Sequence, residues 1–199
     1  MTLFSKRIFD IFFSSVGLIL LSPAFLVIAI LIKIDSPGPV FYRQIRVGKD
    51  GEEFYIYKFR KMRDDAGSNG PNVTAINDSR LTNFGSFLMK HKLDELPQLW
   101  NVFIGDMSLV GPRPELPCFV KLYTDQQMQI LKVKPGITDF AAISFIGEGE
   151  LLSKADDPEK YYVETLMETK LDQNFRYINE MSLKTDLKII MTTLLKILR

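Results

Sequence analysis

The sequence has very few of the residues that build metal clusters and nucleophilic relays. It contains one cysteine, Cys118, and one histidine, His91. These counts exclude an intrachain disulfide, a cysteine metal cluster and a histidine-rich metal site, and they argue against a Ser-His-Asp relay. The formal charge is only +1, so there is no basic excess of the kind that indicates a nucleic-acid partner. Any catalysis is therefore expected to rest on carboxylates, lysines, arginines and hydroxyls.

The near-zero total charge hides a segregation along the chain. Its 199 residues suit one globular domain or a small domain with an appendage, and 46% hydrophobic residues argue against disorder. Basic residues outnumber acidic ones between Lys33 and Arg63 and again from Met181 to the end, whereas acidic residues predominate from Gly147 to Glu180. Part of the surface is therefore predicted to face anions.

An uncharged apolar segment lies near the N-terminus. The stretch 11–32 reads IFFSSVGLILLSPAFLVIAILI, longer than the roughly 18 apolar residues that indicate a membrane helix. The run is too long for a cleaved signal peptide, and no small-residue cleavage site follows it cleanly. The segment is therefore predicted to enter a membrane.

Ser22-Pro23 lies in the middle of this segment and is expected to break it. Proline removes one backbone hydrogen bond and clashes with the preceding turn. It leaves two arms, each only about half as long as the hydrocarbon layer is thick. Lysines and arginines flank the segment on both sides, for example Lys6 and Lys33, which favours placing both ends in the cytoplasm. We expect a re-entrant hairpin; a kinked spanning helix, as in a receptor or anchor, is the alternative.

The rest of the chain reads as a compact domain of strands and helices. Two β-branched and aromatic runs, Val40–Val47 and Phe54–Phe59, predict a β-hairpin. Residues 64–79 are polar and rich in glycine and asparagine, which is typical of a loop. Helices are expected over the following ranges: Arg80–Lys92, Glu95–Ile104 with an end at Gly105, Glu159–Asn179, and Met181–Arg199.

The last of these helices is amphipathic. Its apolar face consists of Leu183, Leu187, Ile190, Met191, Leu194 and Leu198, and its lysines lie elsewhere. This pattern fits a helix whose face packs on the domain, and equally a helix that lies against anionic lipid. Both interpretations stay open.

The segment LDELPQLW, residues 93–100, carries an acidic pair at the expected start of a helix. Asp94 lies where an N-cap is expected, and Pro97 is tolerated only in the first helical turn. An ordinary cap followed by Glu95 explains the pattern. The alternative is catalytic: one carboxylate attacks phosphorus while the other helps hold a divalent cation that screens the repulsion between anions.

Basic side chains in other segments are candidates for binding an anion. Prolines flank Arg113 in GPRP and fix the direction of a guanidinium suited to phosphate. In YKFRKMR, Lys58 and Arg60 alternate on one face of a strand, where a solvated basic edge is the alternative. Arg80 is a further candidate. The turn KPGIT, residues 134–138, carries little information by itself.

Together, these segments resemble one family. Their order is the apolar segment with Ser22-Pro23, then YRQIRVGKDG, YKFRKMR, LDELPQLWNVFIGDMSLVGPRPE and KPGIT. The series resembles the bacterial sugar transferases of the monotopic phosphoglycosyl transferase superfamily. The resemblance implies transfer of a sugar 1-phosphate from a nucleotide sugar, usually a UDP sugar, to polyprenyl phosphate, which starts assembly of a surface glycan.

The resemblance also implies roles for residues. Asp94 becomes the nucleophile of a covalent phosphosugar intermediate. Glu95 completes the acidic pair, so that Asp94 and Glu95 place Mg²⁺, and Arg113, with Lys58 and Arg60, binds phosphate. Ser22 and Pro23 form the re-entrant break that keeps the site at the cytosolic face of the inner membrane.

We therefore expect an α+β, mostly helical monotopic membrane protein. Residues 1–36 form the re-entrant helix-break-helix, and residues 37–199 form a cytosolic catalytic domain with a small β-hairpin and an amphipathic C-terminal helix. The expected partners are a nucleotide-sugar donor, polyprenyl phosphate and membrane lipid, with a homodimer left open and no nucleic acid.

Two departures from the family pattern stand out. Members usually carry arginine five residues before the catalytic aspartate, where this chain has Met89; Lys90 or Lys92 are candidates to supply that charge. Many members continue GIT with glycine and later carry Gly-Arg, whereas this chain continues with Asp139. A catalytically inactive membrane-bound scaffold for other glycan-assembly enzymes is the alternative function.

Overall fold

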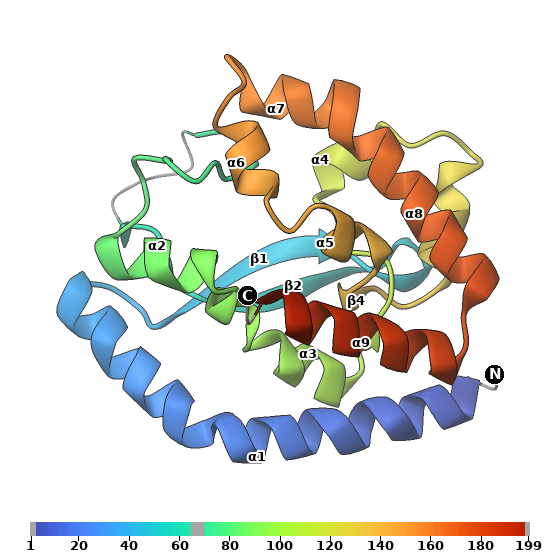
Figure 1. Cartoon of the computed structure of the whole chain (residues 1–199), viewed down its shortest axis with the longest axis horizontal. Helices are drawn as coiled ribbons and strands as arrows, with labels where there is room; N and C mark the ends of the chain where they lie inside the picture. The colour runs from blue at the N-terminus through green and yellow to red at the C-terminus, as the bar shows by residue number, and fades with distance from the viewer. Residues whose placement is uncertain (1–2, 65–69, 198–199) are drawn as a thin grey trace.

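The computed structural model describes residues 3–64 and 70–197, and the chain is mostly helical with short strands (Figure 1). The α+β, mostly helical prediction is confirmed. The longer elements are α1 (Leu3–Asp35), β1 (Phe41–Val47), β2 (Glu53–Phe59), α2 (Asn83–Lys90), α3 (Gln98–Ile104), α8 (Met167–Glu180) and α9 (Leu183–Ile197). Shorter ones are η1 (Lys49–Gly51), η3 (Leu93–Glu95), β3 (Ser108–Val110), α4 (Pro117–Val120), η4 (Gln127–Lys132), β4 (Gly136–Thr138), α5 (Phe140–Ser144), α6 (Glu148–Leu152), α7 (Pro158–Tyr161) and η5 (Tyr162–Leu166).

The predicted β-hairpin is confirmed. Strands β1 and β2 pair antiparallel with Phe41 opposite Phe59 and Val47 opposite Glu53. The chain reverses at Asp50 and Gly51, both with positive φ, a conformation that glycine adopts without steric cost and aspartate tolerates. Figure 1 shows the hairpin crossing the middle of the molecule. It thereby carries Lys58 into the interior, where this residue is buried.

The predicted interruption of the N-terminal helix at Ser22 and Pro23 is wrong. Helix α1 continues through Pro23, and Figure 1 shows it bent rather than broken. Proline at position 23 cannot donate to the carbonyl of Ile19, four residues earlier, but the Ser22 hydroxyl donates to that carbonyl at 2.8 Å. Such a side-chain bond lets a helix accommodate proline by bending.

Both ends of α1 are attached to the globular part of the chain. Near its start, the Lys6 ammonium pairs with Asp186 of α9 at 2.6 Å, and the Arg7 guanidinium donates to the carbonyls of Val102 and Phe103 at the end of α3. In its second half, the buried residues Ile28 and Ile32 pack with Phe59 and Leu88, joined by Phe25. The helix therefore lies along the domain instead of projecting from it (Figure 1).

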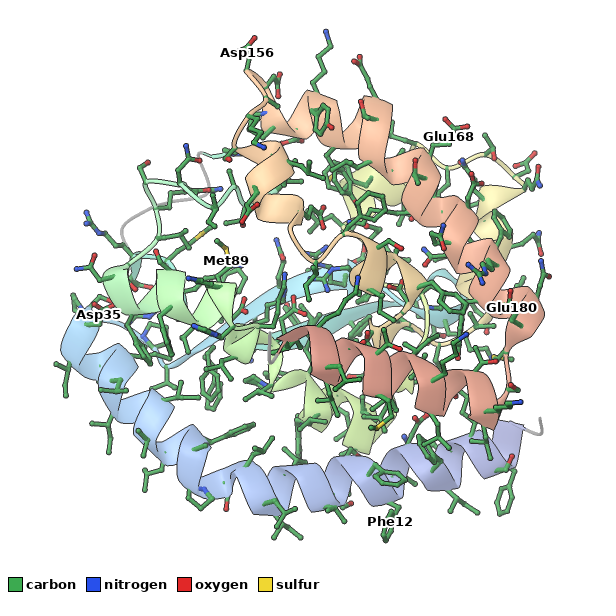
Figure 2. The ribbon with its side chains drawn as sticks, in the orientation of Figure 1. Phe12, Asp35, Met89, Asp156, Glu168 and Glu180 are labelled. Atoms are coloured by element: carbon green, nitrogen blue, oxygen red, sulfur yellow. The ribbon has the colours of Figure 1, made fainter. Side chains whose placement is uncertain are left out.

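The outer side of α1 is apolar and exposed. Among the described residues, α1 is the one helix that is long and apolar enough to cross a membrane. Figure 2 shows Phe12 pointing away from the globular part of the chain, and Ile19, Leu20 and Ile34 are each more than 70% exposed. Apolar exposure on this scale marks an interaction surface. The placement of α1 in a bilayer and the re-entrant topology stay predictions.

A second small sheet joins two of the sequence motifs. Strands β3 and β4 pair in parallel, with Ser108 beside Gly136; this sheet was not predicted from the sequence. The two backbones approach so closely that a Cβ on Gly136 would lie 2.0 Å from the amide nitrogen of Gly111. Glycine is therefore required where KPGIT meets GPRP, and the amide of Gly136 donates to the carbonyl of Pro112 at 2.9 Å. The KPGIT turn positions the loop that carries Arg113.

The predicted helices are present, with changes at their ends. The first begins as α2 after Thr82, whose hydroxyl caps the amide of Gly85, because threonine is a good N-cap. The second ends at Gly105 as expected, with φ of 104°. The third is α7, the π-helical turn η5 and α8. Residues 65–69 of the expected loop and the last two residues of the expected C-terminal helix lie outside the described residues.

Helix α9 packs on the domain through Ile189, and Ile190 of the predicted apolar face packs against the same buried cluster. Ile189 and Asp186 are buried, and the Thr193 hydroxyl lies 2.7 Å from the hydroxyl of Thr138. Most of the predicted apolar face is exposed: Leu183, Leu187, Met191 and Leu194. Leu198 lies outside the described residues. The helix therefore packs on the domain and also leaves an apolar stripe in solvent.

Candidate functional site

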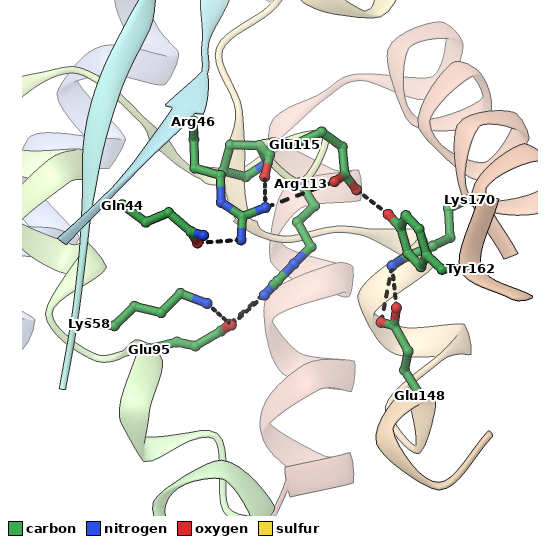
Figure 3. Close-up of polar contacts among 10 residues, drawn as sticks. Gln44, Arg46, Lys58, Glu95, Arg113, Glu115, Glu148, Tyr162 and Lys170 are labelled. Atoms are coloured by element: carbon green, nitrogen blue, oxygen red, sulfur yellow. Dashed lines mark hydrogen bonds and ion pairs between the residues drawn. The ribbon is translucent and has the colours of Figure 1, made fainter. Parts of the chain in front are cut away.

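A polar cavity of about 210 Å³ lies between the hairpin, η3 and the helices that follow α5. It is lined by both members of the acidic pair, Asp94 and Glu95, and by Lys58 and Arg113. The structure thus brings together four of the predicted site residues from three segments distant in sequence. Figure 3 shows the charged side chains that meet there.

Glu95 is the centre of a three-residue group, which we call the Glu95 cluster, in which Lys58 is buried and Glu95 and Arg113 are half-buried. The Lys58 ammonium lies 2.9 Å from Glu95 Oε1. The Arg113 guanidinium donates to both carboxylate oxygens, through Nη1 at 3.2 Å and through Nη2. This two-pronged pairing is the one that arginine forms with carboxylates and phosphates. The cluster therefore presents two cations in a geometry that an anion can use.

The charges of the Glu95 cluster perturb one another. Burial alone would raise the pKa of Glu95, but the charges of Arg113 and Lys58 outweigh it and hold this pKa well below its ordinary value. Burial lowers the pKa of Lys58 to about 8, against the opposing effect of Glu95. Glu95 raises the pKa of Arg113. Near neutral pH the cluster therefore contains one carboxylate and two cations, which suits the binding of a phosphate group.

Asp94 lies beside this cluster in the short 3-10 turn η3. The predicted N-cap role is wrong: η3 follows Lys92 in a left-handed conformation with φ of 56°, and the Asp94 side chain forms no cap to η3 or α3. Instead, Asp94 Oδ2 pairs with the Lys61 ammonium at 3.2 Å, and the residue is only 2% exposed. Its other oxygen, Oδ1, has no hydrogen-bond partner among the described residues.

The unpartnered oxygen of Asp94 is a functional signal. A buried carboxylate oxygen without a partner is costly, and natural proteins keep few of them. It is therefore available as a metal ligand or as a nucleophile. The sequence could not reveal this state, because the spacing of LDELP is also that of an ordinary helix start.

The donor set of the site fits Mg²⁺. Among the described residues, no group of three or more His, Cys, Asp or Glu side chains is placed to hold a metal. Mg²⁺ does not need such a cage, because it commonly uses one or two carboxylates together with waters and substrate phosphates. Asp94 offers its free Oδ1. Both oxygens of the adjacent Glu95 accept from Lys58 and Arg113, so Glu95 would share them with the ion. Asp94 and Glu95 would thus suit Mg²⁺ bound jointly with a phosphorylated substrate.

A second polar group extends the cavity away from η3. Figure 3 shows Glu115 accepting from the Tyr162 hydroxyl, and Glu148 accepting two bonds from the Lys170 ammonium at 2.9 and 3.0 Å. Burial and the Glu115 charge raise the pKa of Tyr162. Tyr162 opens the π-helical turn η5, and such turns occur frequently at functional sites. None of these four residues was predicted from the sequence as a site residue.

Asp139, noted as a departure from the family pattern, supports the loop that carries Arg113. It is buried, it caps α5 by accepting from the amide of Ala142, and it accepts from the backbone amide of Arg113 at 3.2 Å. Burial raises the pKa of Asp139. Asp139 therefore fixes the backbone next to the guanidinium of Arg113.

The structure places two of the candidate anion-binding residues outside the cavity. The Arg60 guanidinium donates to the carbonyls of Ser36, at 2.8 Å, and Pro37, where it satisfies carbonyls just beyond α1. Arg80 is paired with Asp78 at 2.7 Å and donates to the carbonyl of Pro71. Whether either residue contributes to substrate binding stays a prediction, but each is engaged in holding the chain together.

Met89 lines the cavity, as do Lys90 and Lys92. Figure 2 shows Met89 at the end of α2 that faces the middle of the molecule. The ion pair to Asp94 comes from neither of the two lysines expected to replace the missing charge, but from Lys61. Lys61 follows β2 and belongs to the YKFRKMR segment; the sequence analysis did not count it among the site residues.

The chain matches one family over its whole length. The model of the family described as bacterial sugar transferase matches residues 1–199. A UDP-glucose:undecaprenyl-phosphate glucose-1-phosphate transferase of Xanthomonas campestris pv. campestris is 42% identical over 200 residues, which cover 98% of this chain and 39% of that protein. A UDP-N-acetylgalactosamine-undecaprenyl-phosphate N-acetylgalactosaminephosphotransferase of Aeromonas hydrophila is 38% identical over 199 residues, which cover 98% of this chain and 44% of that protein.

A third relative is closer in length. The exopolysaccharide production protein PSS of Rhizobium leguminosarum bv. phaseoli is 37% identical over 200 residues, which cover 97% of this chain and 94% of that protein. The chain therefore spans about two fifths of the length of the first two relatives, at 39% and 44%, and nearly all of the third.

Proposed function

The chain belongs to the bacterial sugar transferase family, and we propose that it transfers a sugar 1-phosphate from a UDP sugar to undecaprenyl phosphate or a similar polyprenyl phosphate. The observation that carries this proposal is the pairing, in one cavity, of a buried carboxylate oxygen without a partner on Asp94 with the cations of the Glu95 cluster. The named activities of the two longer relatives support the same reaction class. Release of the sugar lipid starts assembly of a surface glycan.

The proposed reaction has two displacements at one phosphorus atom. Asp94 Oδ1 attacks the phosphorus that carries the sugar, and a bond forms between them. The bond from this phosphorus to the bridging oxygen breaks, and UMP leaves with its electron pair. An oxygen of polyprenyl phosphate then attacks the same phosphorus and displaces the Asp94 carboxylate. This covalent route divides one difficult transfer into two easier steps.

The cations of the Glu95 cluster bind the phosphates of the donor. Arg113 offers a planar fork and Lys58 a compact charge, and both are preorganised by Glu95 at 3.2 Å or less. Because they are fixed before the reaction, they stabilise charge that develops on the phosphate oxygens without reorganising. Asp94 and Glu95 would hold Mg²⁺, which would supply further positive charge to screen the repulsion between carboxylate and diphosphate.

We place the reaction at the cytosolic face of the inner membrane. Residues 1–36 form the membrane element, and residues 37–199 form the catalytic domain. Both ends of α1 contact the same domain, through Lys6 and through Ile32, while its outer side is apolar and exposed. This arrangement favours a helix that enters and leaves one leaflet, where a lipid phosphate and a soluble nucleotide sugar can meet.

Two measurements test the proposal. The first is release of UMP when the purified protein is given polyprenyl phosphate, Mg²⁺ and each of several UDP sugars. The second is labelling of the protein by a donor with radioactive phosphorus in the sugar phosphate, in the absence of lipid. We expect turnover with at least one donor and a label at Asp94, both abolished in Asp94→Asn.

The control and the contrary outcomes are distinct. Arg176→Gln alters an exposed ion pair on α8 and should leave turnover intact. An active protein that never acquires a label at position 94 contradicts the covalent route. A folded protein that turns over no donor supports the scaffold alternative instead.

A further inference from the structure

The Lys61 side chain reaches into the catalytic cavity and holds one oxygen of Asp94. Its ammonium lies 3.2 Å from Oδ2, and the exposed fractions of the two side chains are 19% for Lys61 and 2% for Asp94. Oδ1 of the same carboxylate has no hydrogen-bond partner among the described residues. The two oxygens of Asp94 are therefore unequal: one is fixed by a cation and the other is free.

The backbone that carries Lys61 is itself held in place. The carbonyl of Lys61 accepts from the amide of Thr82 at 3.0 Å, at the start of α2. Gly85 packs so closely there that a Cβ on it would lie 1.9 Å from the Lys61 carbonyl oxygen. Met62 and Leu81 form an isolated antiparallel bridge one residue further on. Lys61 thus extends from a fixed point, which makes it suited to orienting another side chain.

We infer that Lys61 is the positioning residue for the attacking carboxylate: it binds Asp94 Oδ2 and thereby leaves Oδ1 as the oxygen that attacks phosphorus. This inference rests on the proposed function. Without the pairing, the carboxylate can rotate about its last side-chain bond and present either oxygen in several directions. Misplacement of a reacting group by about 1 Å can cost about 100-fold in rate.

The group that faces Lys61 changes its charge during the proposed reaction. Once Oδ1 is bonded to phosphorus, Oδ2 becomes the carbonyl oxygen of a mixed anhydride and loses its negative charge. The Lys61 ammonium then remains beside a phosphoryl group that still carries charge. Displacement of Asp94 by polyprenyl phosphate restores the carboxylate and its ion pair. The lysine gains and loses no proton in either step.

Lys61 and Met89 line the same cavity as Asp94. Met89 carries no charge, and of the lysines that line the cavity it is Lys61 that pairs with Asp94. An arginine introduced at position 89 would therefore add a cation to the cavity that holds Asp94. In this chain, the charge next to Asp94 comes from Lys61.

The experiment compares four variants with the wild type: Lys61→Met, Lys61→Arg, Lys160→Met, and Lys61→Met combined with Met89→Arg. Lys160→Met is the matched control, because it makes the same substitution at an exposed lysine that pairs with Glu164 outside the cavity. For each protein, kcat and donor KM are measured by UMP release. The rate of Asp94 labelling by donor without lipid is also measured, and a thermal melt checks folding.

We expect Lys61→Met to lower kcat and the labelling rate by about 100-fold, with a much smaller change in KM. Lys61→Arg keeps the charge and should retain more activity, and Met89→Arg should restore part of the activity lost in Lys61→Met. A folded Lys61→Met protein with wild-type kcat overturns the inference, as does a loss in Lys160→Met as large as that in Lys61→Met. If Met89→Arg restores no activity to the Lys61→Met protein, an arginine at position 89 cannot take over the role of Lys61.

A further measurement separates this inference from the proposed function. The NMR signal of the Lys61 ammonium should shift in Asp94→Asn in the absence of any substrate, because it reports the ion pair alone. If Asp94→Asn shifts the signal but the wild type turns over no donor, the proposed function and the role of Lys61 in it are overturned, while the contact between Lys61 and Asp94 stands. An active wild type together with an unimpaired Lys61→Met overturns the role of Lys61 alone.

Discussion

Asp186→Ala is expected to destabilise the protein strongly, because Asp186 joins the first and last helices of the described chain. Its carboxylate is fully buried and accepts from Lys6 of α1 at 2.6 Å and from the Tyr177 hydroxyl at 2.8 Å. Tyr177 also donates to the carbonyl of Val110 at 3.1 Å, so the tyrosine keeps a partner in the variant. In the variant, Lys6 loses its paired carboxylate and keeps a hydrogen bond to the Tyr177 oxygen, at 3.2 Å.

The size of the expected destabilisation follows from Lys6, which is left without a carboxylate partner. Lys6 is only 8% exposed, and breaking a buried ion pair by removing one partner costs about 3–5 kcal/mol. For a chain of this size, each 1 kcal/mol lowers the melting temperature by about 2–4 °C. We therefore expect the midpoint to fall by about 6–20 °C. Because the pair holds the N-terminal end of α1, that end should also become accessible to protease.

The assay is unfolding of detergent-solubilised protein, followed by the fluorescence of the single tryptophan, Trp100. This residue lies on α3, which packs on α1. Glu180→Ala is the matched control, because it breaks the ion pair between Glu180 and Arg176. The side chains of Arg176 and Glu180 are 56% and 49% exposed, and exposed ion pairs contribute about 0–1 kcal/mol to stability. Adding Lys6→Met to Asp186→Ala should recover part of the loss, since it removes the stranded charge.

A loss in Asp186→Ala no larger than that in Glu180→Ala would refute this reasoning. It would mean that the Lys6–Asp186 contact is not a buried ion pair in the folded protein. An additive effect of Lys6→Met and Asp186→Ala would lead to the same conclusion, because residues that interact directly are not additive.

Two further predictions concern the cavity and its frame. Burial lowers the pKa of Lys58 to about 8, so the lysine is cationic below that pH and neutral above it. We therefore expect donor kcat/KM to decline as the pH rises through about 8. Lys58→Arg should move this decline to higher pH, and an unchanged pH profile would contradict the role of Lys58. Gly85→Ala would place a Cβ 1.9 Å from the Lys61 carbonyl oxygen. This variant should destabilise the protein by about 1–3 kcal/mol or more and lower its activity, because Lys61 is displaced. Ser86→Ala on the same helix is the control, and equal melting temperatures for the two variants would contradict the clash.

The sequence carried enough local information to predict most of the individual elements. The β-hairpin follows from alternating β-branched and aromatic residues, and the end of α3 follows from Gly105. The apolar character of α1 follows from the absence of charge over 11–32. These features depend on residues close together in the chain, so periodicity and turn chemistry are sufficient to predict them. The acidic pair and Arg113 were also identifiable, because their motifs are continuous in the sequence.

Contacts between distant segments could not be predicted in the same way. The bond by which Ser22 satisfies the carbonyl that Pro23 leaves free is local, between residues three apart, and the rule that proline breaks a helix does not include it. The parallel pairing of β3 with β4 depends on two glycines 25 positions apart, Gly111 and Gly136, whose backbones touch. Short strands of three residues carry too little periodicity to be recognised.

The sequence by itself determined the chemistry that this chain can offer: with one cysteine and one histidine, its reactive groups had to be carboxylates and cations. The tertiary structure alone decided which of them meet. It placed Arg60 on backbone carbonyls, brought Lys58 and Arg113 to Glu95, and set Lys61 against Asp94. The physical reason is that charges act over a few ångströms of space, and the folding of the chain, not the spacing of its residues, brings groups within that range.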